Sequence, residues 1–159
     1  MASAVHAVEA SGIGRFMRES LWAYPGVEVV HIAGLGLLFG SIVVVDLRLL
    51  GLGRGVPATK LAALSVPWTL VGFLMALCSG LLMFSAHAED FLGNPIFLIK
   101  MSLVFVAGMN ALWLHLGPFA HARAWDVGGV PPAIVRLAAG LSIVIWLCVI
   151  TCGRLLAYT

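Results

Sequence analysis

VEVVHIAGLGLLFGSIVVVDLRLL, residues 27–50, is an apolar stretch longer than the roughly 20 residues that a helix needs to cross the hydrocarbon of a bilayer. Three further apolar stretches follow, at about residues 66–86, 95–117 and 133–157. The sequence is 62% hydrophobic and 10% charged, which excludes a soluble domain. A chain of 159 residues holds four such spans and little else. We therefore expect an all-α fold: one transmembrane domain over residues 1–159, built as an integral membrane four-helix bundle in the lipid bilayer, with no extramembrane catalytic module.

Proline and glycine mark the predicted ends of the spans. Pro25-Gly26 precedes the first span, and a glycine-rich segment at residues 51–55 follows it. Pro67 opens the second span, Asn94-Pro95 opens the third and Pro131-Pro132 opens the fourth. Because proline is tolerated in the first turn of a helix and not in its interior, we expect these helices to begin at their prolines.

The first 25 residues lack the basic start and the apolar core of a signal peptide, so we expect no cleavage. Residues of about 12–24 carry an apolar stripe at helical spacing, made of Ile13, Phe16, Met17, Leu21 and Tyr24. The other side of this helix carries Arg15, Arg18 and Glu19. The pattern predicts a short N-terminal amphipathic helix lying in the membrane interface, where it anchors the bundle or roofs a site near the outer face.

Four spans return the chain to its starting side, so the two long loops share one face and the termini share the other. The positive-inside rule counts Lys and Arg near the span ends. The loop face carries Arg48, Arg54, Lys60, Arg123 and Arg136, and the face of the termini carries Arg15, Arg18, Lys100 and Arg154. By this small margin we expect a multi-pass protein of the bacterial inner (cytoplasmic) membrane with both termini in the periplasm.

Three histidines, His31, His87 and His115, lie in or at the ends of the spans. An ionisable side chain at such depth is costly in lipid, so each histidine marks a candidate site. At a rise of about 1.5 Å per residue, His31 lies about one and a half turns below the outer end of the first span. His87 closes the second span roughly 30 Å from Pro67, so it also lies near the outer face and the two histidines can meet. His115 lies roughly 30 Å from the outer end of the third span, near the inner face.

The first and third spans each carry a polar stripe. His31 and Asp46 in the first span, and Lys100 and His115 in the third, are 15 residues apart and lie within about 60° of one another around the helix. Such stripes should face the interior of the bundle, away from lipid. We therefore expect an outer polar layer that contains His31, His87 and Lys100, and an inner layer that contains Asp46 and His115.

The outer layer suits a haem. Two neutral imidazoles from different helices can supply both axial ligands of a low-spin haem iron. We expect haem b held by His31 and His87, and held noncovalently because the chain has no CxxCH motif. Glycines near both histidines leave room for the macrocycle. Lys100, Arg15 and Arg18 are cations on the same side that can bind the haem propionates.

The inner layer is expected to neutralise its own charges, with Asp46 paired with His115 or with Arg48. In a functional alternative, Asp46 orients His115 as a metal or haem ligand, or exchanges a proton with it. A pairing of His115 with His121 in the inner loop would give a second bis-histidine site. The sequence therefore allows one haem or two.

Two other classes of protein stay open. Soft ligands gather toward the outer half, namely Met83, His87, Cys148 and Cys152, and Cu(I) prefers such ligands. This set favours a copper-binding or copper-transport protein. In the remaining alternative the chain is a cofactor-free structural or assembly subunit, and its histidines are packing residues that hydrogen bond to carbonyl groups or water. The three cysteines all lie within spans, which argues against a disulfide framework.

Small residues recur at four-residue spacing, at Gly36 and Gly40 and again at Gly72, Ala76 and Gly80. Such spacing is typical of close contacts between helices or between subunits in membranes. We therefore expect a homo-oligomer.

A resemblance to a known family covers the first three spans. The chain resembles a family of short four-span bacterial membrane proteins of unknown function in the stretches PGVEVVHIAGLGLLFGSIVVVDLRLLG, SGLLMFSAHAEDFLGNPIFLIK and MNALWLH. Its most specific pieces are the spacing from the histidine to DLRLLG and the NPxFxxK segment. The resemblance implies the four-span architecture and highlights His31, Asp46, Lys100 and His115. The chain is also loosely similar to membrane b-type cytochromes and to copper-resistance membrane proteins of the CopD kind, without a diagnostic motif of either.

These patterns favour a membrane-bound b-type haem protein that transfers electrons to or from a quinone or a periplasmic redox partner, as an electron-transfer protein or an oxidoreductase. They contain no nucleophile arrangement, phosphate-binding loop or nucleic-acid surface. Hydrolysis, nucleotide chemistry and nucleic-acid binding are therefore disfavoured.

Overall fold

The computed structural model describes residues 2–158, and these residues form helices without any strand. In chain order the helices are α1 (Ala2–Glu9), α2 (Gly12–Glu19), α3 (Ala23–Leu50), α4 (Ala58–Ala86), α5 (Ala88–Gly93), α6 (Pro95–Leu116), the 3₁₀ helix η1 (Pro118–Ala124) and α7 (Ala133–Leu155). Four of them, α3, α4, α6 and α7, are long and apolar enough to cross a membrane. The prediction of an all-α membrane four-helix bundle is confirmed.

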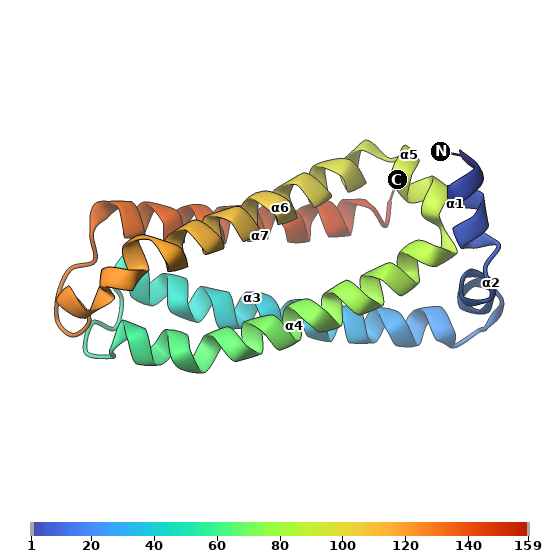
Figure 1. Ribbon diagram of the computed structural model, residues 1–159. Helices are drawn as coiled ribbons and strands as arrows, with labels where there is room; N and C mark the ends of the chain where they lie inside the picture. Colours follow the sequence, from blue (N-terminus) through green and yellow to red (C-terminus); the bar gives the residue numbers. More distant parts are fainter. Residues whose placement is uncertain (1, 159) are drawn as a thin grey trace.

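The four long helices form two antiparallel hairpins. Helix α3 packs against α4, α6 packs against α7, and the two hairpins meet mainly through α3 and α7 (Figure 1). Helices α4 and α6 contact each other through side chains, since the rings of Phe84 and Phe97 stack with 5.9 Å between their centroids. Both termini and helices α1, α2 and α5 lie at one end of the bundle, which we call the terminal end (Figure 1). Segments 51–57 and 117–132 lie at the opposite end, which we call the loop end.

Helices α3 and α4 approach closely because glycines replace side chains where they cross. A Cβ atom at Gly72 would stand 2.5 Å from the backbone nitrogen of Leu38, and one at Gly34 would stand 2.8 Å from the backbone nitrogen of Ala76. The predicted role of Gly72 in close helix packing is therefore confirmed. Gly36 and Gly40 behave differently, since a Cβ at either position would meet nothing within 4 Å.

Two of the helices begin earlier than the sequence patterns predict. Helix α3 starts at Ala23, so Pro25 lies in its first turn, where proline is tolerated. Helix α4 starts at Ala58 and contains Pro67 in its interior. The Thr69 hydroxyl donates a hydrogen bond to the carbonyl of Ser65 (3.1 Å) beside this proline. Proline removes one backbone donor, which leaves the carbonyl of Ala63 without its helical partner, and membrane helices tolerate such interior prolines.

A buried arginine holds the loop end together. The Arg48 side chain is only 2% exposed, and its Nε and Nη2 atoms donate hydrogen bonds to the carbonyls of Val56 and Asp126, both at 2.6 Å. The Asp126 carboxylate accepts hydrogen bonds from the backbone N–H (2.9 Å) and the hydroxyl (2.6 Å) of Thr59. The hydrogen bond from the Thr59 side chain is the main reason why the pKa of Asp126 lies below its ordinary value. These contacts join segment 51–57 to segment 117–132.

The N-terminal segment forms two short helices where one amphipathic helix over about residues 12–24 is predicted. Helix α2 ends at Glu19 because Ser20 has extended backbone angles, and the chain restarts as α3 at Ala23. Along α2, Met17 is buried (2% exposed), whereas Ile13 (57%) and Phe16 (63%) are exposed. The predicted apolar stripe is therefore split between a contact with the bundle and an outward apolar surface.

Candidate functional site

A single hydrogen bond fixes the chemical state of His31, which lies half-buried on α3. Its Nδ1 lies 2.9 Å from the Ser79 hydroxyl oxygen of α4. The Ser79 hydroxyl has one hydrogen, and it donates this hydrogen to the Met75 carbonyl at 2.5 Å. The hydroxyl lies closer to this carbonyl than to the ring, which favours donation to Met75, and His31 then donates from Nδ1 to Ser79. This tautomer leaves Nε2 with a free lone pair, available to a metal ion or a proton.

Gly80 makes the space that the His31 ring occupies. A Cβ atom at Gly80 would stand 3.3 Å from Cε1 and 3.6 Å from Nδ1 of the ring. Because real Cβ contacts are rarely this tight, any side chain at position 80 would press on the imidazole. On the facing surface of α4, Ser79 therefore hydrogen bonds to the His31 ring and Gly80 leaves space for it.

Lys100 of α6 extends into the same layer of the bundle. Its Nζ lies 3.5 Å from the point where a Cβ at Gly153 of α7 would stand, so this glycine also leaves room for a polar side chain. The Lys100 charge lies close enough to act on His31, and Cys152 of α7 lies close enough to act on Lys100. All four long helices thus contribute to one layer. We call it the His31 layer, and its members are His31, Ser79, Gly80, Lys100, Cys152 and Gly153.

His87 does not belong to this layer, although the depth estimate from the sequence brings it level with His31. It caps the C-terminal end of α4, its ring lies against Tyr24 (5.9 Å between centroids), and its Nδ1 lies 3.6 Å from an Asp90 carboxylate oxygen. Gly80 of α4 faces His31, and Tyr24 of α3 faces His87. Along α4, His87 lies seven residues beyond Gly80, and along α3, His31 lies seven residues beyond Tyr24. The two histidines are therefore about 10 Å apart along the bundle. The estimate is wrong because α3 begins at Ala23, which places His31 about one turn deeper than expected.

The side chain of His87 is 46% exposed and faces the terminal end. It borders an open groove of about 630 Å³ whose lining residues are His87, Asp90, Phe91, Gly93, Asn94, Pro95, Ile96 and Leu156. This groove lies between the end of α4, α5 and the start of α6. The structure therefore presents His87 to solvent or to the membrane surface, whereas it holds His31 inside the bundle.

The inner polar residues do not pair as predicted. Asp46 is buried (4% exposed) and its hydrogen-bond partner is Ser142 of α7. His115 is exposed on α6, where its Nδ1 lies 2.9 Å from the carbonyl of Ala111 in its own helix. Arg48 binds the loop carbonyls described above. The predicted pairing of Asp46 with His115 or Arg48 is therefore wrong: the three side chains have different hydrogen-bond partners, and Oδ2 of Asp46 and Nη1 of Arg48 are buried without one.

Asn110 of α6 and His121 of η1 are two further polar residues toward the loop end. The Asn110 amide donates a hydrogen bond from Nδ2 to the carbonyl of Ala138 (3.1 Å), which joins α6 to α7. His121 is exposed in η1. Since His115 and His121 both face outward, the structure gives no buried bis-histidine pair at the loop end.

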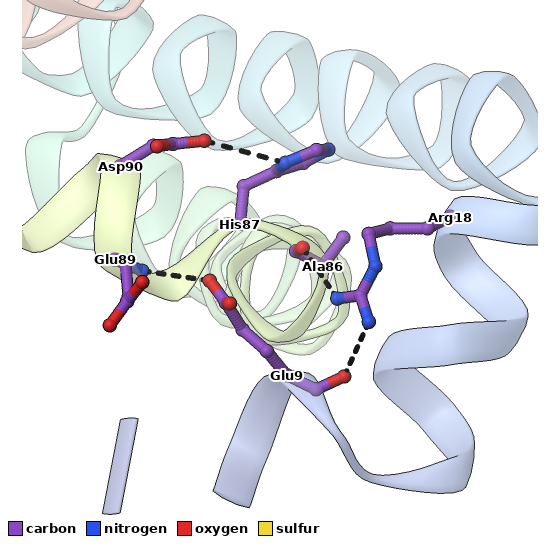
Figure 2. Close-up of polar contacts among 6 residues, drawn as sticks. All are labelled: Glu9, Arg18, Ala86, His87, Glu89 and Asp90. Carbon is purple, nitrogen blue, oxygen red and sulfur yellow. Dashed lines mark hydrogen bonds and ion pairs between the residues drawn. The ribbon is translucent and has the colours of Figure 1, made fainter. Parts of the chain in front are cut away.

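The two arginines among the predicted propionate cations have different surroundings. Arg18 donates from Nη1 to the carbonyl of Ala86 (2.8 Å) and from Nη2 to the carbonyl of Glu9 (2.7 Å), as Figure 2 shows. It therefore ties α1 and α2 to the end of α4. Arg15 is exposed on α2. Neither arginine reaches the His31 layer through a contact described in the structure.

The predicted copper ligands are not gathered. Among residues 2–158, a single group of three His, Cys, Asp or Glu side chains has its ligand atoms close enough to share a metal ion, and its members are His6, Glu9 and Glu89. His87, Cys148 and Cys152 do not form such a group, and Cys148 is exposed on α7. Sequence reasoning missed the new cluster because it lies outside the spans and joins residues 80 positions apart. The spacing of His6 and Glu9 on one helical face was the available signal.

Comparisons with known proteins give one match. Residues 9–159 match the model of a family of unknown function, DUF6644. No curated protein and no solved structure matched the chain. No match supports the loose similarity to b-type cytochromes and CopD-like proteins. The resemblance to an uncharacterised family of short membrane proteins is confirmed. Because the match covers nearly the whole sequence, this chain belongs to the DUF6644 family.

Proposed function

We propose that this protein is a membrane-bound b-type haem protein that transfers electrons, in which Nε2 of His31 would hold the haem iron. The observation that carries the proposal is the hydrogen bond between Nδ1 of His31 and the Ser79 hydroxyl: with Ser79 donating to Met75, Nδ1 carries the ring hydrogen and Nε2 keeps its lone pair. A ligating histidine in a protein typically donates its other ring N–H to a neighbouring acceptor in this way. The exposed His115 has a similar contact with Ala111, and His31 differs from it because it lies between two membrane helices.

The rest of the His31 layer supports the same function. Gly80 gives the His31 ring its place against α4, and Gly153 of α7 lies beside the Lys100 ammonium group, so small residues flank both polar side chains. Lys100 is a cation in the same layer and can pair with a haem propionate. Haem supplies the one-electron redox chemistry, and the protein supplies the ligand, the cation and an apolar surrounding.

His87 lies about 10 Å from the level of His31, so we expect a single histidine ligand rather than the bis-histidine pair. An iron with one protein ligand keeps an open position. Carbon monoxide should therefore bind the reduced protein and shift its Soret absorption band. A spectrum that carbon monoxide leaves unchanged would show a second protein ligand and contradict this part of the proposal.

The decisive variants replace one histidine each. His31→Ala should purify without haem, whereas His115→Ala should keep the full complement, because His115 is an exposed membrane-helix histidine bonded only to its own helix. Haem content per chain, measured by pyridine haemochrome absorbance, is the readout. Full haem retention in His31→Ala would overturn the assignment. Equal loss in both variants would also overturn it, because the loss would not depend on the proposed ligand.

The location and partners belong to the same proposal. We place the protein in the bacterial inner membrane with the terminal end in the periplasm, where it exchanges electrons with a quinone or a periplasmic protein. Support comes from the exposed cations of the loop end, which are Arg54, Lys60, Arg123 and Arg136. A C-terminal fusion to alkaline phosphatase should be active, because this enzyme works only after export. An inactive phosphatase fusion together with a fluorescent C-terminal green fluorescent protein fusion would reverse the orientation.

A homo-oligomer remains part of the proposal. Gly36 and Gly40 leave an uncovered small-residue surface on α3, and such surfaces allow helices of two subunits to approach closely. Gly36→Leu should therefore shift the protein to a smaller particle in size-exclusion chromatography with light scattering. The same mass for the wild type and the variant would contradict an interface at this surface.

A further inference from the structure

We propose that His6, Glu9 and Glu89 form a binding site for a divalent transition-metal ion such as Zn²⁺ at the terminal end of the bundle. Their ligand atoms all lie within 4.8 Å of one another. His6 and Glu9 are three residues apart on α1 and therefore share one face of that helix. Glu89 is in the first turn of α5, so the site joins the start of the chain to the connection between α4 and α6.

One pair of ligand atoms, from His6 and Glu89, already lies closer together than around an ion, and Glu9 is joined to the backbone of Glu89. His6 Nε2 lies 2.9 Å from a Glu89 carboxylate oxygen, and a Glu9 carboxylate oxygen accepts a hydrogen bond from the backbone N–H of Glu89 at 2.9 Å. Around a tetrahedral Zn²⁺ with bonds of about 2.0–2.2 Å, neighbouring donor atoms lie about 3.3–3.5 Å apart. Small side-chain rotations are therefore enough to bring one nitrogen and two oxygens around an ion.

The charges of the cluster also favour a cation. Two carboxylates within this distance repel each other unless a positive charge lies between them. His6 balances them only when it is protonated, whereas a divalent ion balances both and takes neutral His6 as a ligand. The His6 and Glu89 side chains are 63% and 46% exposed, so an ion and a fourth ligand from water can reach the site. A set of one imidazole and two carboxylates prefers Zn²⁺ to Mg²⁺ or Ca²⁺, which favour oxygen ligands alone.

The backbone around the cluster is braced independently of any ion. Arg18 donates hydrogen bonds to the carbonyls of Glu9 (2.7 Å) and Ala86 (2.8 Å), which fixes α1 against the end of α4 (Figure 2). Figure 2 also shows the Glu9 carboxylate directed toward the backbone nitrogen of Glu89. The ligands therefore lie on a scaffold that is already assembled, which reduces the ordering that ion binding requires. Metal binding would lock α1 to α5 beside the groove that His87 borders.

The test is a titration of the full-length protein, purified in detergent through an affinity tag without histidine, with Zn²⁺ in a calorimeter. We expect one ion per chain. His6→Ala and Glu89→Gln should each weaken binding by more than about 10-fold. The matched control is His87→Ala, which removes an exposed histidine of the same end that contacts only one carboxylate, and it should bind Zn²⁺ like the wild type.

Co²⁺ gives a second readout, because a site with few ligands produces strong visible absorption bands that an octahedral aquo ion lacks. The bands should appear with the wild type and with His87→Ala, and should be lost with His6→Ala. No heat and no bands with the wild type would overturn the proposal. Binding in His6→Ala as tight as in the wild type would also overturn it, and so would equal weakening in His87→Ala.

Discussion

Gly72 should be the position in the membrane helices that is least tolerant of an added methyl group. In Gly72→Ala the new Cβ would lie 2.5 Å from the Leu38 nitrogen and 2.8 Å from the Gly34 oxygen, where ordinary contacts are 3.4–4 Å. Both atoms belong to the backbone and cannot rotate away, so α3 and α4 must separate by about 1 Å. Overpacking of this kind costs about 1–3 kcal/mol. The separation should also weaken the hydrogen bond between His31 and Ser79, two turns further along α4.

The assay is reversible unfolding in mixed detergent micelles, followed by the fluorescence of the five tryptophans. Gly108→Ala on α6 is the matched control, because its Cβ would meet nothing within 4 Å and alanine favours a helix over glycine. We expect Gly72→Ala to lose about 1–3 kcal/mol of unfolding free energy and Gly108→Ala to lose none. Equal stability of the two variants would refute the close approach of α3 and α4 on which the position of His31 depends.

Three further predictions concern the loop end and the His31 layer. Arg48→Met removes two short hydrogen bonds from a charged donor to loop carbonyls, each worth about 1.5–3 kcal/mol. The same unfolding assay should therefore show that the unfolding free energy falls by about 3 kcal/mol or more. A loss below about 1 kcal/mol would contradict the role of this side chain. Ser79→Ala should lower the unfolding free energy by less than about 1 kcal/mol. It should lower haem affinity by about 10–100-fold, because His31 loses its hydrogen-bond acceptor. Unchanged affinity in a haem titration would refute the role of Ser79 in haem binding. The pKa of Asp126 is lower in the folded protein than in the unfolded chain, so its contribution to stability is complete above the unfolded value of about 3.9 and is lost as the pH falls through the folded value. Thr59→Val should reduce this loss of stability, measured as the unfolding free energy from pH 6 to pH 3. An unchanged pH profile in Thr59→Val would contradict the role of Thr59.

The membrane architecture was predictable because the requirement for long apolar helices leaves few alternatives. Four apolar stretches gave the four helices, and Asn94 and Pro132 lie as caps at the starts of α6 and α7. The start of α4 was missed because a proline such as Pro67 marks a helix start in water, whereas a membrane helix can continue through it. The early start of α3 was missed for a related reason, since Pro25 fits within a first turn.

The candidate site was predictable in part. The polar stripes correctly indicated that His31 and Lys100 face the bundle interior, because an ionisable side chain in a membrane needs polar or charged partners. The partners of each group were not predictable, since Ser79 and Ser142 are ordinary helix residues whose relevance depends on which faces of two helices meet. An error of one turn in a helix start was enough to bring His87 falsely level with His31.

The measurement that tests the proposed function most directly is the absorption spectrum of the detergent-purified wild-type protein, air-oxidised and then reduced with dithionite, with iron and copper determined in the same sample. We predict a Soret band that shifts on reduction and about one iron per chain, as expected for a haem ligated by His31. A flat visible spectrum from protein produced with ample haem would contradict the proposal. In that case copper in the sample would favour the copper-binding alternative, and the absence of both metals would favour a cofactor-free subunit.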